Sequence, residues 1–152
     1  MAYWLVKSES GNYSIGDLER DRVTFWGGVR NYQARNFLRQ MKKGEQVLFY
    51  HSVTEPVGVV GICRVKKEAY PDPTQFDSKS QYFDAAASPE EPRWFCPDVE
   101  FVERFAQVLP LTDIRTLRGL ADMELLRRGS RLSVQVASLK HFEIIVDAAR
   151  KM

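Results

Sequence analysis

Runs of β-prone residues alternate along the chain with stretches of helical periodicity. In five segments, aromatic, β-branched and other apolar residues follow one another closely enough to indicate buried strands. Two of these segments, 46–51 and 57–70, are close neighbours in sequence, and we expect them to pair. The predicted strands cover residues 3–6, 46–51, 57–70, 94–105 and 132–136.

Capping residues mark where helices begin between these strands. Ser14 and Asp17 have the spacing of a capping box and predict a short helix that ends near Arg20. A second helix shows apolar residues at helical spacing until Gly44 stops it. The predicted helices begin after Ser14, Asn31 and Ser138, with shorter ones at 112–117 and 122–128. Strands interleaved with short helices predict an α+β fold, a small and partly closed sheet with helices packed at its rim.

The segment 71–92 differs from its surroundings. It holds four prolines and many small polar residues, so we expect one long irregular loop. Long loops in compact domains are more often functional than accidental.

Length, composition and cysteine use indicate an ordinary globular domain. With 152 residues, of which 44% are hydrophobic and 28% charged, the chain can bury a core, and we predict one domain over residues 1–152. Cys63 and Cys96 lie inside apolar runs and are expected to be free thiols. Two histidines and two such cysteines disfavour a zinc site, so we predict no metal and no cofactor. No signal peptide or membrane-spanning apolar run is present, so we expect a cytoplasmic protein without membrane contact.

The charge is small overall but uneven. A formal net charge of +2 disfavours a protein that binds nucleic acid mainly by broad phosphate neutralisation. Segment 30–43 nevertheless holds five basic residues and no acid, whereas 84–103 holds six acids and one arginine. We predict a local basic face, although Arg39, Lys42 and Lys43 fit the solvated face of a helix as well.

The segment 26–36 combines recognition groups with a break in local structure. Two adjacent glycines let the backbone turn where a side chain would clash. Flat or cationic side chains surround them, namely Trp26, Arg30, Tyr32 and Arg35. A planar polar ligand such as a nucleobase suits this collection. Trp26 is equally suited to fill the core, so both interpretations stay open.

Polar residues also stand at the ends of two predicted strands, at 7–9 directly after the first and at 50–52 at the end of the second. Adjacent residues on an extended strand point to opposite faces, so neither group forms a ready-made catalytic dyad. Hydrogen bonds to the edge of a base require no proton transfer and suit these groups better. Tyr50 fits a stacking surface and a core position equally well.

The turn at 127–131 carries three arginines around one glycine. Guanidinium groups in that arrangement suit phosphate oxygens, and solvated arginines on a surface turn fit the spacing equally well. The glycine pair of segment 26–36 lacks the spacing of the dinucleotide-binding and P-loop motifs. This disfavours a fold that binds nucleoside triphosphates.

Six motifs along the chain together carry a family resemblance. They are Tyr-Trp-Leu-Val-Lys-Ser-Glu at 3–9, Gly-Val-Arg-Asn-Tyr-Gln-Ala-Arg-Asn at 28–36, Val-Leu-Phe-Tyr-His-Ser at 47–52, Glu-Ala-Tyr-Pro-Asp at 68–72, Pro-Arg-Trp at 92–94 and Leu-Arg-Arg-Gly-Ser-Arg-Leu-Ser-Val at 126–134. With them the chain resembles the EVE-domain family almost end to end; that family belongs to the PUA-like group, which also contains the YTH readers of methylated adenine in RNA. One departure is Ser10, which stands where the family usually has proline and leaves the backbone less restricted.

The resemblance implies a PUA-like twisted, partly closed β-barrel with short flanking helices and no catalytic activity. It also implies a pocket that binds DNA or RNA through a flipped or unpaired modified base of the 5-methyl- or 5-hydroxymethylcytosine type. On this chain the base would be bound by Lys7, Ser8, Glu9, Trp26, Val29, Asn31, Tyr32, Tyr50, His51, Ser52, Ser130, Leu132 and Ser133. Phosphates would be bound by Arg30, Arg35, Arg128 and Arg131.

Within that set we expect Trp26 to stack on the base, with Ser8, Glu9 and Asn31 on its edge. Because the rim is cationic and the walls aromatic, a crystal grown without nucleic acid is expected to hold an anionic buffer molecule in the pocket. Two alternatives stay open. One is an enzyme acting on a nucleotide or small anionic metabolite, and the other is a protein-interaction module that uses the 71–92 loop.

Overall fold

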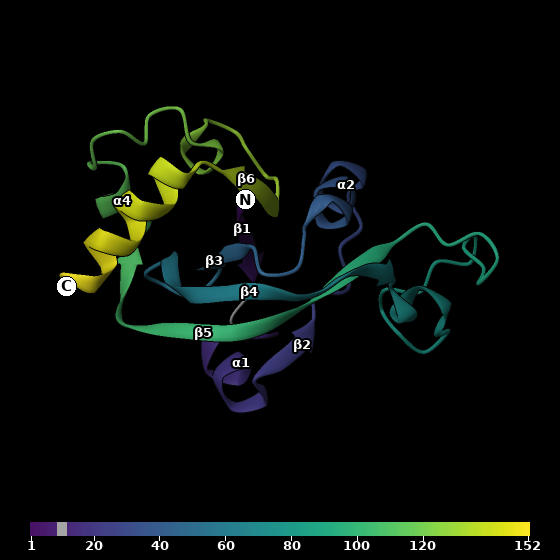
Figure 1. Cartoon of the computed structure of the whole chain (residues 1–152). Coiled ribbons are helices and arrows are strands. Elements are labelled where there is room, and N and C mark those ends of the chain that lie inside the picture. Colours follow the sequence, from purple (N-terminus) through teal and green to yellow (C-terminus); the bar gives the residue numbers. More distant parts are fainter. Residues whose placement is uncertain (9–11) are drawn as a thin grey trace.

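Six strands form one mixed sheet around which the helices pack, as the computed structural model shows for residues 1–8 and 12–152 (Figure 1). The strands are β1 (Tyr3–Ser8), β2 (Val23–Phe25), β3 (Gln46–His51), β4 (Gly58–Pro71), β5 (Phe95–Pro110) and β6 (Val134–Ala137). Their order across the sheet is β2-β5-β4-β3-β1-β6, and only β1 and β3 pair in parallel. This arrangement confirms the predicted α+β class.

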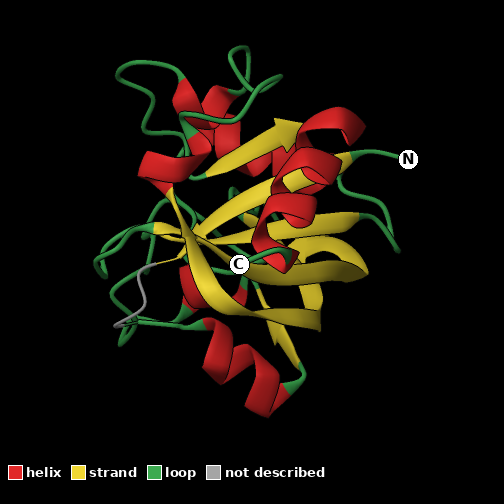
Figure 2. Ribbon diagram, turned by 90° about the vertical axis from the view of Figure 1, so that its left-hand side faces the viewer, coloured by secondary structure: helices red, strands yellow, loops and turns green. Residues whose placement is uncertain are grey.

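The sheet is strongly twisted, but it stays open (Figure 2). Among the described strands, β2 and β6 end the order on opposite sides and do not pair with each other. Both are short, with three and four residues. The sheet is therefore less closed than the barrel that the family resemblance implies.

Most of the predicted strands are found close to their expected bounds. β3 and β4 pair antiparallel, as their sequence separation predicts. β5 continues to Pro110, five residues beyond the expected end, because its pairing with β4 extends as far as Gly58. β2 was not predicted, since it has only three residues, and the side chains of Val23 and Phe25 are exposed rather than part of an apolar run.

Side-chain caps start three of the helices, as predicted. Ser14 and Asp17 exchange hydrogen bonds in a capping box, Asn31 accepts from the Ala34 N–H, and Ser138 caps the last helix. The helices are α1 (Ile15–Asp21), α2 (Tyr32–Gln40), α3 (Leu111–Ile114) and α4 (Leu139–Arg150), with 3₁₀ turns η1 (Pro73–Phe76) and η2 (Glu124–Leu126). None of the helices in the described ranges combines the length and the apolar character needed to cross a bilayer.

The core consists of two apolar clusters, one on each face of the sheet. Along β1, Leu5 belongs to one cluster and Trp4 to the other, as the alternation of a strand requires. The cluster of Leu5 is covered by α4 and by the segment that contains Leu120 and Leu125. The cluster of Trp4 is covered by α1 and α2. The buried Cys63 and Cys96 are free thiols, which confirms their prediction.

The β4–β5 ribbon reaches past α2, and the predicted long loop lies at its far end (Figure 1). Gln75 of η1 is fully buried there. Its side-chain amide donates to the carbonyls of Asp72 and Trp94, and its oxygen accepts from the N–H groups of Arg93 and Trp94. These four hydrogen bonds hold η1 against the segment that leads into β5.

Candidate functional site

Segments that lie far apart in sequence surround a cavity of about 680 Å³. It is lined by the end of β1, by β2 and the glycine pair after it, by the long loop and by the residue before β6. We call it the aromatic cavity, because Phe25, Trp26 and Tyr82 contribute to its walls. Six of the predicted site residues line it: Lys7, Ser8, Trp26, Val29, Arg30 and Ser133.

The two glycines after Trp26 are required by close contacts. A Cβ on Gly27 would lie 2.6 Å from the Phe25 ring, and one on Gly28 would lie 2.8 Å from the Tyr82 ring. Gly28 also has a φ of 81°, which side chains other than glycine rarely adopt. The glycine pair thus lets two aromatic rings approach the backbone that forms the cavity wall.

Trp26 serves both roles that the sequence left open. Its side chain is only 9% exposed, and its ring meets the Phe49 ring edge-on at a centroid distance of 5.4 Å. The residue also lines the aromatic cavity. Trp26 is therefore a core residue of which one part forms the wall of the cavity.

Arg30 is occupied by the protein itself. Its guanidinium group donates to the carbonyls of Val29 and Tyr82, to the Thr74 hydroxyl and to the Asp72 carboxylate. These contacts use all five of its N–H groups. The expected contact of Arg30 with a phosphate is therefore revised, because the side chain holds the long loop to the segment before α2 and has no N–H left to donate.

Asp72 is the buried counterpart of Arg30. Its carboxylate is fully buried and accepts from the Gly28 N–H at 2.8 Å and from the N–H and hydroxyl of Thr74. Burial alone would raise the pKa of this carboxyl, but the hydrogen bonds from Thr74, Gly28 and Arg30 outweigh it and lower the pKa. The ionised carboxylate thus fixes the glycine turn and the loop in one arrangement.

Lys7 is one of the residues that line the aromatic cavity, and its ammonium lies near Tyr50 and Glu124. Its ammonium lies 5.8 Å from the centroid of the Tyr50 ring, and no acceptor in the described part of the chain lies within hydrogen-bonding distance. Partial burial lowers the pKa of Lys7, and the nearby charge of Glu124 opposes that shift. A ligand that offers an acceptor would satisfy this side chain.

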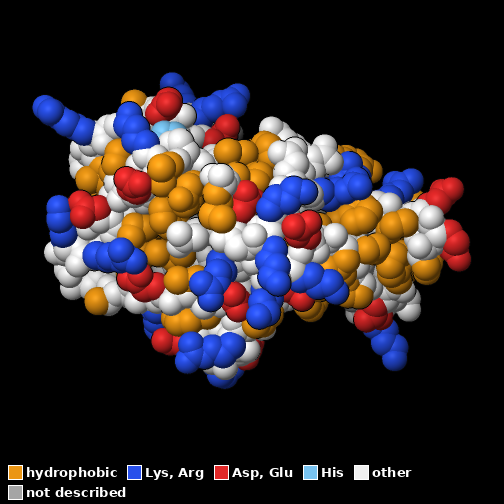
Figure 3. Space-filling model, viewed as in Figure 1, with side chains coloured by type: hydrophobic (Ala, Val, Ile, Leu, Met, Phe, Trp, Pro, Cys, Tyr) orange, Lys and Arg blue, Asp and Glu red, His pale blue; other side chains and the backbone are white. Residues whose placement is uncertain are grey.

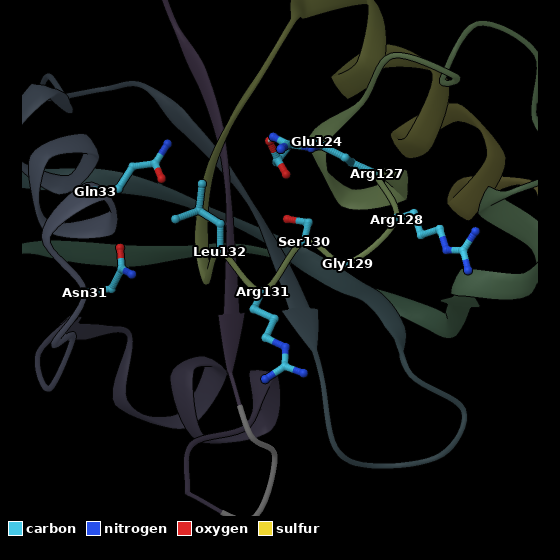
Figure 4. A pocket seen from close by; sticks show the side chains of 9 residues that line it. All are labelled: Asn31, Gln33, Glu124, Arg127, Arg128, Gly129, Ser130, Arg131 and Leu132. Carbon is cyan, nitrogen blue, oxygen red and sulfur yellow. The ribbon is translucent and has the colours of Figure 1, made fainter.

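A second, smaller hollow of about 280 Å³ lies beside η2 (Figure 4). We call it the arginine hollow, since three arginines line it. Arg127 pairs with Glu124 at 3.4 Å, whereas Arg128 and Arg131 make no hydrogen bond or ion pair with the described residues. Figure 4 shows these last two side chains extending in different directions from the turn. Ser130 adds a buried hydroxyl oxygen without a partner in the described residues.

The predicted residues divide between the two hollows. Asn31, Ser130, Leu132, Arg128 and Arg131 line the arginine hollow and not the aromatic cavity. Both hollows use the same two stretches of chain, 28–33 and 130–133, so they are neighbours. Asn31 caps α2 through its side-chain oxygen. The single pocket expected from the sequence is thus a pair of adjoining hollows.

Tyr32 and Arg35 lie outside both hollows, on the first turns of α2. Tyr32 stacks on Trp94 with 4.8 Å between ring centroids. The Arg35 guanidinium donates to the Arg93 carbonyl and to the Asn36 side-chain oxygen. Tyr32 was expected in the pocket and Arg35 on a phosphate. In the structure Tyr32 packs on Trp94, and Arg35 donates to groups of the protein itself.

The 50–52 segment also lies away from both hollows. Tyr50 is 4% exposed and belongs to the core on the α4 side of the sheet. His51 accepts the Ile15 N–H on its Nε2 atom, and burial, with Arg104 nearby, lowers its pKa and keeps the ring neutral. Ser52 donates its N–H to the Ser8 carbonyl. These residues join β1, β3 and α1, and the Nε2 atom that a catalytic base would use is already bonded.

Nine residues that line the aromatic cavity are absent from the predicted site: Asn12, Tyr13, Thr24, Phe25, Gly27, Gly28, Thr74, Gln81 and Tyr82. Thr74, Gln81 and Tyr82 belong to the long loop, and its composition was the one signal that pointed to them. The predicted contact of Glu9 falls outside the described residues. Within residues 1–8 and 12–152, no group of three or more His, Cys, Asp or Glu side chains has a metal-binding arrangement.

Lys and Arg side chains gather over α2 and the adjoining part of the β4–β5 ribbon (Figure 3). The sequence of α2 and its flanks accounts for this, because 30–43 carries no acid. Figure 3 shows acidic side chains spread over this face, with some of them at the far end of the molecule where the long loop lies. The predicted basic face is thus present beside the two hollows.

The chain is similar to known proteins in sequence and in fold. The family model described as the EVE domain matches residues 2–148. The chain is 42% identical to thymocyte nuclear protein 1 of Gallus gallus, over 95% of this chain and 67% of that protein. A crystal structure of a Pseudomonas syringae protein matches with a TM-score of 0.95 and 44% identity, covering 97% of this chain and 99% of that one. The crystal structure of human THYN1 protein in complex with 5-methylcytosine-containing DNA matches with a TM-score of 0.92 and 36% identity, covering 100% of this chain and 99% of that one.

Proposed function

Since the chain belongs to the EVE-domain family, we propose that residues 1–152 act as one non-enzymatic module that binds nucleic acid through a modified base. One observation carries this proposal: the human relative that shares the fold over the whole chain was solved with DNA containing 5-methylcytosine. The same proposal includes a PUA-like, partly closed β-barrel as the fold type and the cytoplasm as the location. The word nuclear in the name of the Gallus gallus relative refers to that protein and does not decide the location of this one.

The aromatic cavity is the proposed base subsite. Its volume of about 680 Å³ admits a pyrimidine ring together with a 5-substituent. Phe25, Trp26 and Tyr82 supply apolar and π surfaces, and stacking of this kind contributes about 1–3 kcal/mol per base. That amount offsets the few kcal/mol needed to take a base out of its stack.

Polar groups at the ends of β1 and β6 would bind the edge of the base. Lys7 offers an ammonium with no acceptor in the described residues, and Ser8 and Ser133 bring further polar groups to the same wall. A pyrimidine carbonyl oxygen is an acceptor that suits Lys7. The expected role of Glu9 on the base edge stays part of the proposal.

The arginine hollow is the proposed phosphate subsite. Arg128 and Arg131 keep their donors available, and the Ser130 hydroxyl oxygen is buried without a partner in the described residues. Guanidinium and hydroxyl donors are the usual partners of phosphate oxygens. Because the two hollows adjoin, one strand would place its base in the cavity and its backbone in the arginine hollow.

Discrimination between a modified and an unmodified base is expected to be modest if it rests on burial alone. Burial of one methyl group contributes about 0.8 kcal/mol, which corresponds to roughly fourfold in affinity. A larger preference requires a close fit to the 5-substituent or a polar partner for a hydroxymethyl group.

The test is a panel of matched DNA and RNA oligonucleotides that differ only in one unpaired cytosine, which is unmodified, 5-methylated or 5-hydroxymethylated. Fluorescence anisotropy at two salt concentrations measures the affinity of each. The Ser133→Phe variant, which adds a ring at the cavity wall, is expected to abolish the preference for the modified base. The Arg128→Gln, Arg131→Gln double variant is expected to weaken every oligonucleotide alike and to reduce the salt dependence.

Arg118→Gln is the matched control, because this exposed arginine lies outside both hollows and its loss should leave binding unchanged. Equal affinity of the wild type for all three cytosines would overturn the base-reading proposal, and so would a preference for the modified base that Ser133→Phe leaves unchanged. Turnover of a nucleotide or ester by the wild-type protein would favour the enzyme alternative.

A further inference from the structure

Four planar groups form a ladder that runs from the aromatic cavity to the surface. Tyr82 lines the cavity, and the Arg30 guanidinium carbon lies 5.6 Å from the centroid of its ring. The same guanidinium lies 5.3 Å from the Trp94 ring, and Trp94 stacks on Tyr32 with 23° between the ring planes. The ladder therefore starts in the cavity wall and ends at Tyr32.

The outer face of Tyr32 is turned to solvent. The side chain is 52% exposed, whereas Trp94 beneath it is 6% exposed. Arg35 lies 4.8 Å from the Tyr32 centroid and also only 6.0 Å from the Trp94 ring. A group stacked on the outer face of Tyr32 would have the whole Tyr32 ring between itself and Trp94, and its distance from Trp94 would be much greater than that of Arg35. Arg35 therefore lies at the side of the stacked pair and leaves the outer face of Tyr32 uncovered.

The position of Tyr32 connects it to both hollows. Its neighbour Arg30 lines the aromatic cavity, and Asn31 and Gln33 line the arginine hollow. The surrounding segment 30–43 carries five cations and no acid. An exposed ring in a basic environment suits a ligand that is both aromatic and anionic, as a nucleotide is.

We infer that the outer face of Tyr32 is a second stacking subsite, which takes the base next to the one held in the aromatic cavity. This inference rests on the proposed function, because it assigns a place to a neighbouring nucleotide of the same strand. The ring is held flat on Trp94 before any ligand arrives, so little conformational freedom is lost when a base stacks on it. The footprint is then two bases with the connecting phosphate in the arginine hollow.

A purely structural role would be to cover Trp94, and suitable variants separate the two roles. Tyr32→Phe keeps the aromatic face, Tyr32→Leu keeps an apolar cover over Trp94, and Tyr32→Ala removes both. Phe83→Ala is the matched control, because Phe83 is 43% exposed on the long loop and lines neither hollow. Thermal melting checks that each variant is folded.

The experiment measures anisotropy with three short single strands that carry one 5-methylcytosine. The first has ordinary flanking bases, and the other two have an abasic residue on the 5′ or the 3′ side. Tyr32→Ala and Tyr32→Leu are expected to bind the first strand about tenfold more weakly than the wild type, and Tyr32→Phe and Phe83→Ala should match the wild type. With an abasic residue on the stacking side, the wild type should lose the same factor and Tyr32→Ala should lose nothing further.

Full affinity of Tyr32→Leu would overturn the inference, because covering Trp94 would then be sufficient. Equal weakening of Tyr32→Ala on intact and abasic strands would overturn it as well. In both cases the wild type still binds the modified strand, so the proposed function survives. Failure of the wild type to bind any strand overturns the proposed function and this inference together.

Discussion

The carboxylate of Asp72 and the guanidinium of Arg30 lie 3.2 Å apart and join the end of the β4–β5 ribbon to the segment before α2. The Asp72 side chain is almost completely buried, and the same carboxylate accepts the Gly28 N–H. One ion pair thus fixes the glycine turn, the cavity wall and the long loop at the same time. The cavity depends on this pair for its shape.

Removal of the Asp72 carboxylate is predicted to destabilise the fold strongly. In Asp72→Ala the Arg30 guanidinium stays partly buried without its counter-charge, and the Gly28 N–H loses its acceptor. Breaking a buried pair in this way costs on the order of 3–5 kcal/mol in the free energy of unfolding. Urea unfolding measures the loss, and limited proteolysis should show earlier cleavage in 72–94.

Asp147→Ala serves as the control for that experiment, because Asp147 pairs with Lys151 at the surface and a change there should have little effect on stability. If Asp72→Ala unfolded at the same urea concentration as Asp147→Ala, the ion pair would not hold the cavity together.

An alanine at Gly28 is predicted to disturb the cavity more than an alanine at Gly129. Both glycines have a positive φ, 81° and 78°, so each substitution carries a similar backbone strain of about 1–2 kcal/mol. A Cβ at Gly28 also meets the Tyr82 ring at 2.8 Å, whereas nothing lies within 4 Å of one at Gly129. Gly28→Ala should therefore lower the melting temperature further and weaken binding of modified DNA. Equal effects of both substitutions would mean that the contact with Tyr82 is unimportant.

Acidification is predicted to destabilise the protein through His51. Burial lowers the pKa of His51 below its ordinary value of 6.5, so the unfolded chain binds this proton more readily than the folded one. The stabilising contribution is complete above about pH 6.5 and is lost as the pH falls through the lower pKa of the folded state.

Urea unfolding at several pH values between about 7.5 and 5 measures this effect. His51→Gln keeps an acceptor for the Ile15 N–H and cannot ionise, so its stability should change less with pH. Arg104→Gln removes the cation that repels a charged His51, and an intermediate pH dependence is expected. A pH profile of His51→Gln identical to that of the wild type would contradict this assignment.

Lys7→Met is predicted to weaken oligonucleotide binding without a large loss of stability. The ammonium has no acceptor in the described residues, and its burial is unfavourable in the free protein. The methionine has a similar length and no charge, so the folded state should keep or gain stability. The measurements are anisotropy with 5-methylcytosine DNA and urea unfolding. Unchanged affinity would remove Lys7 from the base subsite.

Much of the fold follows from local signals in the sequence. Ser14, Asn31 and Ser138 start helices through hydrogen bonds that span only three residues, so their positions are visible in the sequence. The apolar run at 46–51 forms a strand with the same bounds. β2 escaped prediction, because a strand of three partly exposed residues has no period of its own and depends on its pairing with β5.

The candidate site was harder to predict, because it depends on contacts between distant residues. Arg30 and Asp72 are separated by 42 positions, and no local pattern indicates that they pair. The sequence therefore placed Arg30 on a phosphate, whereas in the structure its donors bond to the long loop and to the Val29 carbonyl. Tyr50 and His51 were also expected at the pocket. Tyr50 lies in the core and His51 lies beside α1, because the pairing of β3 in the sheet decides which face each side chain points to.

Binding of the modified base in the aromatic cavity can be observed by NMR. An oligonucleotide carries a ¹³C-labelled methyl group on a single unpaired 5-methylcytosine, and the nuclear Overhauser contacts of that methyl group are recorded in the complex. We predict contacts with ring protons of Phe25, Trp26 or Tyr82 and an upfield shift of the methyl resonance. Contacts confined to Tyr32 or to the arginine hollow, or a methyl shift equal to that of the free oligonucleotide, would contradict the account.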